Sequence, residues 1–398
     1  MTASSLPVLR LKPKTKPQAI RRGYPWVYAN EVVTDRRTRA MTPGTIAVLE
    51  DSDRSPLAMV GVNPNSKIIG RVLDMPEAAA PDQGWFATRL RKAQDLRERL
   101  FSSPYYRLVH AEADGLPGVI IDRFGDIAVI QPNAAWADLL LDDLTAALAD
   151  VTGVTTILKN AGGRGRGLEG LDDVDAVLLG DAPTEPVPVH MNGAIYMADL
   201  VSGQKTGLFF DQRPNHAFAA ALADGARVLD VFSHVGGFGL AALAGGAQHA
   251  HCVDGSEPAL ALATEGARRM GAGDRLTTTR GDAFSVLTSL AEDNAEFDVV
   301  ICDPPAFAPS HKARDAGLRA YERIARLAAP LVAKDGFLVL CSCSHAADMS
   351  AFTGACLRGI GRAGRHAQLI HTGQAGPDHP LMPQLAESGY LKALFFRL

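Results

Sequence analysis

The spacing of apolar and polar residues changes along the chain. Up to residue 75, short apolar runs (PVLRL, TIAVLE, LAMVGV, KIIGRVL) alternate with turn residues, as in a small β-barrel or sandwich. Residues 84–101 instead carry apolar side chains at helical spacing. The run LPGVIIDRFGDIAVIQ indicates two strands around a turn at 122–126, and a helix (136–148) and a strand (155–159) follow. We therefore expect a β-domain over 1–75 and an α+β domain over 76–185.

The pattern of apolar and polar residues changes again in the rest of the chain. The proline-containing stretch GDAPTEPVPV marks a domain edge, and Asn192-Gly193 signals a hairpin. From about residue 225, apolar strands alternate with helices predicted at 238–246, 257–270, 283–292 and 317–333. This alternation predicts a doubly wound, largely parallel sheet, so residues 186–398 are expected to form a Rossmann-like α/β domain.

Composition narrows the class of protein. The chain has 398 residues, enough for two or three domains, and its 47% hydrophobic content is ordinary for a globular protein. No apolar run approaches membrane-spanning length and the N-terminus has no secretory h-region, so we expect a cytoplasmic protein without a membrane partner. The five cysteines are odd in number, which argues against a disulfide framework in a reducing compartment.

The charge is unevenly distributed. The formal net charge is −4, yet residues 10–39 contain nine basic residues against two acidic ones. Such a basic stretch can attract phosphates although the whole chain is acidic. An ordinary solvated surface would look the same, so charge alone does not identify the partner.

Acidic residues stand at the ends of four predicted strands, where ligands bind in such sheets. Asp230 precedes the glycine-rich turn VFSHVGGFG, and an acid there suits a cationic ligand better than the pyrophosphate of a dinucleotide. Asp254, 24 residues further on, can bind both hydroxyls of a ribose, and Asp282 can bind an adenine amino group. Asp303, in DPPAF, is expected to border the reactive end of the bound cofactor. Any one of these acids could instead cap a helix, and for Asp282 alone that is the simpler interpretation. Together they predict an S-adenosylmethionine pocket.

The motifs SGQKTGLFFDQRPN, VLDVFSHVGGFG, VDGS, GDAF, CDPPAF, SCSH and DHP, in this order, resemble the PUA-domain class I methyltransferases that make 5-methylcytosine in large-subunit ribosomal RNA. The segments LRLKPKTKPQAIRRGYPWVYANEV and RLVHAEADGLPGVIIDRFGD extend the resemblance to nearly the whole chain. It implies a PUA-like RNA-binding fold at the N-terminus, with Lys12, Lys14, Arg21 and Arg22 as RNA contacts. It also implies cofactor binding by Lys205, Phe209, Asp230, Phe232, Ser233, Gly236, Asp254, Asp282 and Asp303. His234 and the Gly/Arg-rich segment 160–170 depart from the family pattern.

The resemblance makes Cys343 the nucleophile, with Asp303 beside the target ring. Carbon 5 of cytosine becomes nucleophilic only after a thiolate adds to carbon 6, so this reaction needs a cysteine. Cys341 and Cys343 point to the same face of the predicted strand, and Cys343 lies nearer its carboxyl end. Cys341 is expected to be core. Zinc binding by Cys341, Cys343 and His345 is a poor alternative, because no fourth ligand is evident.

These observations predict a cytosine-C5 methyltransferase acting on large-subunit ribosomal RNA or an assembling ribosomal particle. Three alternatives stay open: a guanine- or amine-directed RNA methyltransferase, a catalytically silent RNA-binding assembly factor, and a small-molecule methyltransferase. The sequence also leaves open whether the protein forms a homodimer. DHP (378–380) is expected to border the target base.

Overall fold

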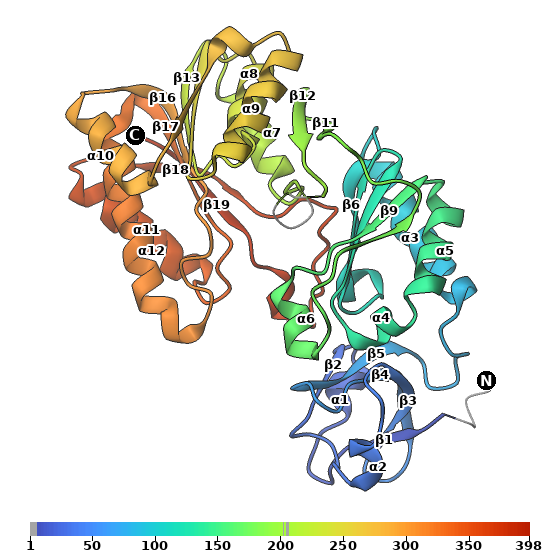
Figure 1. The fold of residues 1–398 in the computed structure, drawn as a ribbon. Coiled ribbons are helices and arrows are strands. Elements are labelled where there is room, and N and C mark those ends of the chain that lie inside the picture. Colours follow the sequence, from blue (N-terminus) through green and yellow to red (C-terminus); the bar gives the residue numbers. More distant parts are fainter. Residues whose placement is uncertain (1–5, 202, 204–206) are drawn as a thin grey trace. The chain divides into compact units, whose positions relative to one another are not determined.

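A computed structural model describes residues 6–201, 203 and 207–398, which fold into two compact units (Figure 1). The first consists of the N-terminal residues up to Pro183 together with a distant segment, Pro377–Ser388. The second consists of Thr184–Gly203, Gly207–Gly376 and Gly389–Leu398. Near its C-terminus, the chain therefore leaves the second unit and then returns to it.

The N-terminal part of the first unit is a five-stranded sheet with the order β1-β3-β4-β5-β2. β1 (Val8–Arg10) runs parallel to β3 (Thr45–Glu50), and β4 (Pro56–Val62), β5 (Ile68–Asp74) and β2 (Trp26–Tyr28) pair in antiparallel fashion. Two short helices, α1 (Gln18–Arg21) and α2 (Arg36–Arg39), lie in the connections. Leu9, Val27, Leu49, Val60 and Ile69 form its core. The predicted β-fold of this region is present.

A second five-stranded sheet completes the unit, with β6 (Tyr105–His110), β7 (Val119–Phe124), β8 (Ile127–Pro132), β9 (Thr156–Lys159) and β10 (Ala176–Leu179). Helices α3 (Gln83–Leu100) and α5 (Leu141–Thr152) pack together over it. Phe86 and Leu90 of α3 join Trp136 in the core, where the Phe86 and Trp136 rings stack 5.9 Å apart. The expected helix near 136–148 is interrupted at Leu140, where α4 (Ala135–Leu139) ends before α5 begins.

The Gly/Arg-rich segment forms a short helix, α6 (Arg164–Glu169), which ends at Gly170 in the left-handed conformation. The guanidinium of Arg166 is 1% exposed and donates to the carbonyl of Pro132 and to the carboxylates of Asp138 and Asp172. Glu169 accepts hydrogen bonds from Asn63 and Ser66 of the N-terminal sheet region. Arg166 and Glu169 therefore tie α6 into the first unit rather than facing solvent.

A buried charge network anchors the distant segment Pro377–Ser388. Arg97 of α3 has a fully buried side chain that makes two 2.7 Å bonds to the carboxylate of Asp114. The same guanidinium donates to the carbonyl of Asp378 at 2.9 Å, and Asp378 accepts from the Arg107 amide and contacts His379. Burial lowers the pKa of the neighbouring His110 to about 2, so its imidazole is neutral. Asp378 and His379 are 0% and 3% exposed. Both side chains therefore belong to a buried network, and the position of DHP beside a target base stays a prediction.

Replacing Arg97 by Met should lower the free energy of unfolding of the first unit by about 3–5 kcal/mol, because the carboxylate of Asp114 would stay buried without its partner. Urea denaturation followed by tryptophan fluorescence would measure the change. Arg91→Met is the matched control on the same helix. Its ion pair with Asp150 spans 3.7 Å between side chains 59% and 63% exposed, so its loss should cost less than about 1 kcal/mol. Equal losses in both variants would contradict this account.

The second unit opens with the predicted hairpin, β11 (Val187–Met191) and β12 (Ala194–Ala198). Asn192 and Gly193 both have positive φ angles, 55° and 75°, which the two-residue turn requires. The main sheet follows with the order β15-β14-β13-β16-β17-β19-β18. Its parallel strands are β13 (Arg227–Val231), β14 (His249–Asp254), β15 (Leu276–Arg280), β16 (Phe297–Cys302) and β17 (Val332–Ser342).

Helices cover both faces of this sheet (Figure 1). α7 (Arg213–Ala221), α8 (Gly237–Ala244) and α9 (Glu257–Arg269) lie on one side, and α10 (Ala283–Glu292), α11 (Arg314–Ala328) and α12 (Met349–Arg362) lie on the other. The doubly wound prediction is confirmed. Helix α12 and the antiparallel strands β18 (Gln368–Gly373) and β19 (Lys392–Arg397) were not predicted. No helix among the described residues is long and apolar enough to cross a membrane.

Candidate active site

The strand order of the second unit places the candidate site. β13 lies between β14 and β16, so the chain turns in opposite directions from the middle of the sheet. In such sheets the crevice at the carboxyl ends of these strands binds the ligand. Asp230, Asp254 and Asp303 all stand at this edge, at or just after the ends of β13, β14 and β16. The structure thus brings the three predicted carboxylates to one edge of the sheet.

The turn after β13 has a strained backbone. Phe232 and His234 adopt φ angles of 63° and 51°, which residues other than glycine rarely adopt. Gly236 follows with a φ angle of 81°. Backbone strain of this kind persists where surrounding contacts hold it and is frequent at ligand sites. Gly239 is required for another reason: a Cβ there would lie 2.5 Å from the sulfur of Cys252. This turn is the glycine-rich turn that the sequence predicted after the strand ending near Asp230.

Asp230 is an incompletely satisfied buried acid at this turn. Its Oδ2 accepts a 2.8 Å hydrogen bond from the Gly239 amide, whereas its Oδ1 is buried and has no hydrogen-bond partner among the described residues. Burial raises the pKa of Asp230 to about 7, although nearby backbone amides oppose the shift. A buried acceptor of this kind fits the amino group of the methionine end of S-adenosylmethionine, which would donate to Oδ1.

Asp254 and Asp282 differ in their surroundings. The carboxylate of Asp254 accepts from the amides of His234 at 2.9 Å and Ser256 at 2.8 Å, and so joins the two loops at this edge. Asp282 is exposed and caps α10 by accepting from the amide of Ser285 at 3.0 Å. The structure shows the capping role of Asp282, while its contact with an adenine stays a prediction.

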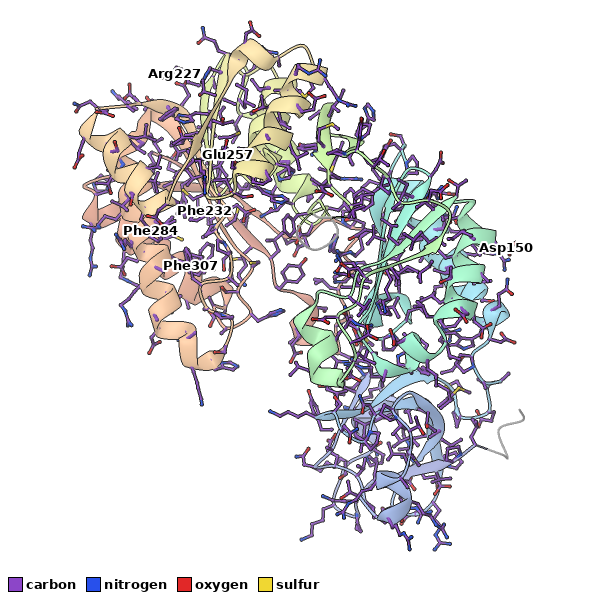
Figure 2. The ribbon with its side chains drawn as sticks, viewed as in Figure 1. Asp150, Arg227, Phe232, Glu257, Phe284 and Phe307 are labelled. Carbon is purple, nitrogen blue, oxygen red and sulfur yellow. The ribbon has the colours of Figure 1, made fainter. Side chains whose placement is uncertain are left out.

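Aromatic side chains gather beside these loops. The ring of Phe307 lies 6.3 Å from that of Phe232 and 6.1 Å from that of Phe284, three residues labelled in Figure 2. Phe209 packs edge-on against His234 at 5.1 Å, which brings the GLFF segment to the turn after β13. Ser233 is 4% exposed. Lys205, the remaining predicted cofactor residue, lies outside the described residues.

Asp303 is held by the amide of Gln212, which the amide of Asn215 holds in turn, and the sequence predicted neither contact. Its Oδ2 accepts from Nε2 of Gln212 at 3.0 Å, and Oε1 of Gln212 accepts from Nδ2 of Asn215 at 2.6 Å. Both amide side chains are buried, at 3% and 1% exposure. The motif FFDQRPN contains both residues, but nothing in their spacing reveals the contact with Asp303. Their hydrogen bonds fix the orientation of the carboxylate next to the DPPAF loop.

Cys343 lies just beyond the end of β17, between Ser342 and Ser344, which are both fully buried. The hydroxyl of Tyr321 is 2.8 Å from each serine oxygen, and Ser344 Oγ accepts from the Ala308 amide at 2.9 Å. This hydroxyl network ties the SCS turn to the loop that follows Asp303. Cys343 itself is half-buried, whereas the other four cysteines are buried and none forms a disulfide. The expected core position of Cys341 is confirmed at 1% exposure, and burial raises the pKa of its thiol far above the usual range.

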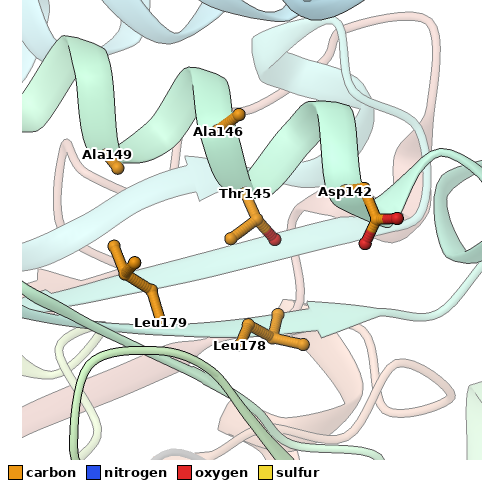
Figure 3. A pocket seen from close by; sticks show the side chains of 6 residues that line it. All are labelled: Asp142, Thr145, Ala146, Ala149, Leu178 and Leu179. Carbon is orange, nitrogen blue, oxygen red and sulfur yellow. The ribbon is translucent and has the colours of Figure 1, made fainter.

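A hollow of about 290 Å³ belongs instead to the first unit (Figure 3). Asp142, Thr145, Ala146 and Ala149 of α5 and Leu178 and Leu179 of β10 line it. None of the residues predicted to bind cofactor or RNA is among them. The hollow is therefore not part of the candidate active site of the second unit.

Comparison with known proteins agrees with this geometry. Residues 139–397 match the family described as S-adenosylmethionine-dependent methyltransferase, and residues 9–75 match a PUA-like domain. A protein of Aeromonas hydrophila named ribosomal RNA large subunit methyltransferase I is 34% identical over 389 residues, covering 96% of this chain and 98% of the relative. A ribosomal RNA large subunit methyltransferase of Deinococcus radiodurans is 34% identical over 412 residues, covering 100% of this chain and 99% of the relative.

The chain belongs to the large-subunit ribosomal RNA methyltransferase family. Its cofactor is S-adenosylmethionine. The fold recurs in a putative methyltransferase from Streptococcus mutans, with a TM-score of 0.82 at 20% identity over 99% of this chain and 100% of that one. A putative methyltransferase complexed with SAH has the same TM-score of 0.82 at 20% identity, over 98% of this chain and 99% of that one. The fold and family expected from the sequence are thus confirmed.

Cofactor affinity should rise with pH through the pKa of Asp230. Below about pH 7 this carboxyl takes up a proton and no longer attracts a cation, so S-adenosylmethionine should bind up to about tenfold more weakly at pH 6 than at pH 8. Isothermal titration calorimetry at several pH values would measure this. Asp230→Asn should bind weakly throughout and keep only the pH dependence of the cofactor itself. An unchanged slope in Asp230→Asn would exclude Asp230 as the source.

Proposed function

We propose that this methyltransferase transfers a methyl group to carbon 5 of a cytosine in large-subunit ribosomal RNA through a covalent bond to Cys343. The observation that carries the proposal is the placement of one half-buried thiol, Cys343, on a turn that Ser344 joins to the loop after Asp303. Methyl transfer to a nitrogen needs no thiol. The names of the relatives support ribosomal RNA as the substrate class.

The thiolate of Cys343 adds to carbon 6 of the cytosine, and the ring electrons move toward carbon 5, which becomes enamine-like. Carbon 5 then takes the methyl group, which S-adenosylmethionine supplies when bound. A base removes the proton from carbon 5, and the electron pair of that bond expels the thiolate from carbon 6. Cys343 is thereby restored. Asp303, oriented by Gln212, would hydrogen-bond the ring near N3 during the addition.

The chain's own residues would hold the cofactor along the carboxyl edge of the sheet. Asp230 would accept from the amino group, Asp254 from the ribose hydroxyls, and Asp282 from the adenine. The turn containing Phe232, Ser233 and Gly236 would lie against the cofactor backbone, and Phe209 and Lys205 would contribute from the GQKTGLFF segment. Asp303 would border the reactive end.

The PUA-like region would bind RNA through its basic surface. Lys12, Lys14, Arg21 and Arg22 are all exposed, and Arg21 is partly neutralised by an ion pair with Asp51 at 3.1 Å. Exposed cations that lack such pairing can neutralise phosphates, which releases the counterions condensed on the RNA. Lys12, Lys14 and Arg22 are therefore the stronger candidates for phosphate contacts.

Cys343→Ala should abolish methylation of ribosomal RNA while leaving cofactor binding intact, because it removes the group that activates carbon 5. Cys341→Ala is the matched control: it should keep activity and cost about 1 kcal/mol of stability, since it trims a buried side chain. RNA containing 5-fluorocytosine should form an adduct that survives denaturing electrophoresis and maps to Cys343, because fluorine cannot leave as a proton. An active Cys343→Ala enzyme would shift the assignment to a nitrogen-directed methyltransferase.

Replacing Lys12, Lys14 and Arg22 together by Gln should weaken RNA binding and reduce its salt dependence. Each lost phosphate contact should lower the log–log slope of affinity against salt by about 0.7–0.9. Filter binding at several salt concentrations would measure the slope. S-adenosylmethionine affinity should not change, and Lys334→Gln, at an exposed position in the second unit, serves as the control. An unaltered slope in the triple variant would remove this surface from the RNA interface.

A further inference from the structure

Lys392 is a buried lysine at the start of β19. It is 7% exposed, and its ammonium donates to the carbonyl of Ser344 at 2.9 Å and to that of Tyr390 at 2.8 Å. Lysine is rarely buried without an ionised partner. The described part of the chain shows no ion pair between Lys392 and a carboxylate, since both recorded acceptors are neutral carbonyls. An ammonium has three N–H donors, so two carbonyls leave one N–H available.

The surroundings of this ammonium point to Cys343. Lys392 pairs directly with Ser342 across β17 and β19, and its side chain reaches the carbonyl of Ser344. Its contacts therefore lie on both sides of Cys343 in the sequence. Burial lowers the pKa of Lys392, and the negative charges of the Cys343 thiolate and Asp348 act against that shift. The ammonium thus binds the backbone of the turn that carries Cys343.

Other titratable and charged groups also lie around Cys343. Tyr321 of α11 is kept neutral, since burial raises the pKa of its hydroxyl. Asp348 is negative and forms an ion pair with Arg314 at 3.2 Å. Arg314 therefore has a carboxylate partner of its own. His345 and Tyr390 lie beside each other, with ring centroids 5.8 Å apart. Among these groups, Lys392 is the buried cation, and it binds the backbone carbonyl of the residue that follows Cys343.

We propose that Lys392 is a positioning residue that keeps Cys343 in its thiolate form and fixes the turn that presents it. The proposal rests on the proposed function, in which Cys343 adds to carbon 6. A buried positive charge favours the thiolate over the thiol, as cations beside reactive cysteines do. The same charge stabilises the thiolate that is expelled when the product forms. The two carbonyl contacts hold the ammonium in place, so little reorganisation accompanies the reaction.

The pH dependence of alkylation of Cys343 by iodoacetamide tests this proposal without requiring methylation. Because the other four cysteines are buried, the fast-reacting thiol is Cys343, and peptide mass spectrometry confirms the site. Lys392→Met removes the charge at similar length and should raise the midpoint of the alkylation profile by at least about one pH unit, a tenfold loss of thiolate near neutrality. Lys392→Arg, which keeps the charge, should retain most of the wild-type profile. Lys334→Met, at an exposed position of β17, should not change it.

The same variants separate the outcomes. In Lys392→Met, the pH profile of kcat should move with the thiol midpoint while the affinity for S-adenosylmethionine stays the same. An unshifted midpoint in a variant that still binds S-adenosylmethionine would overturn the proposal. If Lys392→Met does not bind S-adenosylmethionine, Lys392→Gln, which keeps donors for the carbonyls without the charge, takes its place under the same criterion. A shifted midpoint together with an active Cys343→Ala enzyme would sink the proposed function and leave the Lys392–Cys343 coupling standing.

Discussion

Two backbone hydrogen bonds beyond the ends of the strands set the geometry of the candidate site. The amide of Asp303 donates to the carbonyl of Val231 at 3.1 Å, and the amide of Ser233 donates to that of Val253 at 3.1 Å. They continue the pairing of β13 with β16 and with β14 by one step past the strands. The loops that carry Asp230, Asp254 and Asp303 therefore leave the sheet side by side. Everything proposed for the cofactor depends on this alignment.

The candidate site contains a buried carboxyl group, that of Asp230, whose Oδ1 accepts no hydrogen bond from the described residues. The pKa of Asp230 lies near 7, well above the value of about 3.9 expected for an unfolded chain. The folded protein therefore binds this proton more tightly than the unfolded one, and the associated stability is lost as pH rises through about 7. At neutral pH, this carboxylate weakens the cofactor-free fold. Binding of the positively charged cofactor would stabilise the Asp230 carboxylate. The residue that destabilises the cofactor-free fold would therefore favour cofactor binding.

Local sequence patterns predicted many of the strands, helices and turns. They did not predict contacts between residues that are far apart in the sequence. Asp254 was predictable because a parallel strand has a recognisable apolar run and a carboxylate at its end. The hairpin at Asn192-Gly193 was predictable because the turn conformation demands those residues. By contrast, Gln212 contacts Asp303 across 91 residues, and Lys392 reaches Ser344 across 48. No periodicity encodes such contacts. Strand β19 was missed because KALFFR is a short apolar run at the end of the chain, which periodicity alone does not distinguish from other core segments.

The return of Pro377–Ser388 to the first unit has a consequence for synthesis of the protein. Arg97 and the carbonyl of Asp378 are hydrogen-bonded partners separated by 281 residues. At a synthesis rate of about 5–20 residues per second, roughly 15–55 s pass between the appearance of one partner and that of the other. Throughout this interval the N-terminal unit holds a charged guanidinium whose final acceptor does not yet exist. The unit whose chain is begun first is therefore completed only after most of the methyltransferase sequence has been translated.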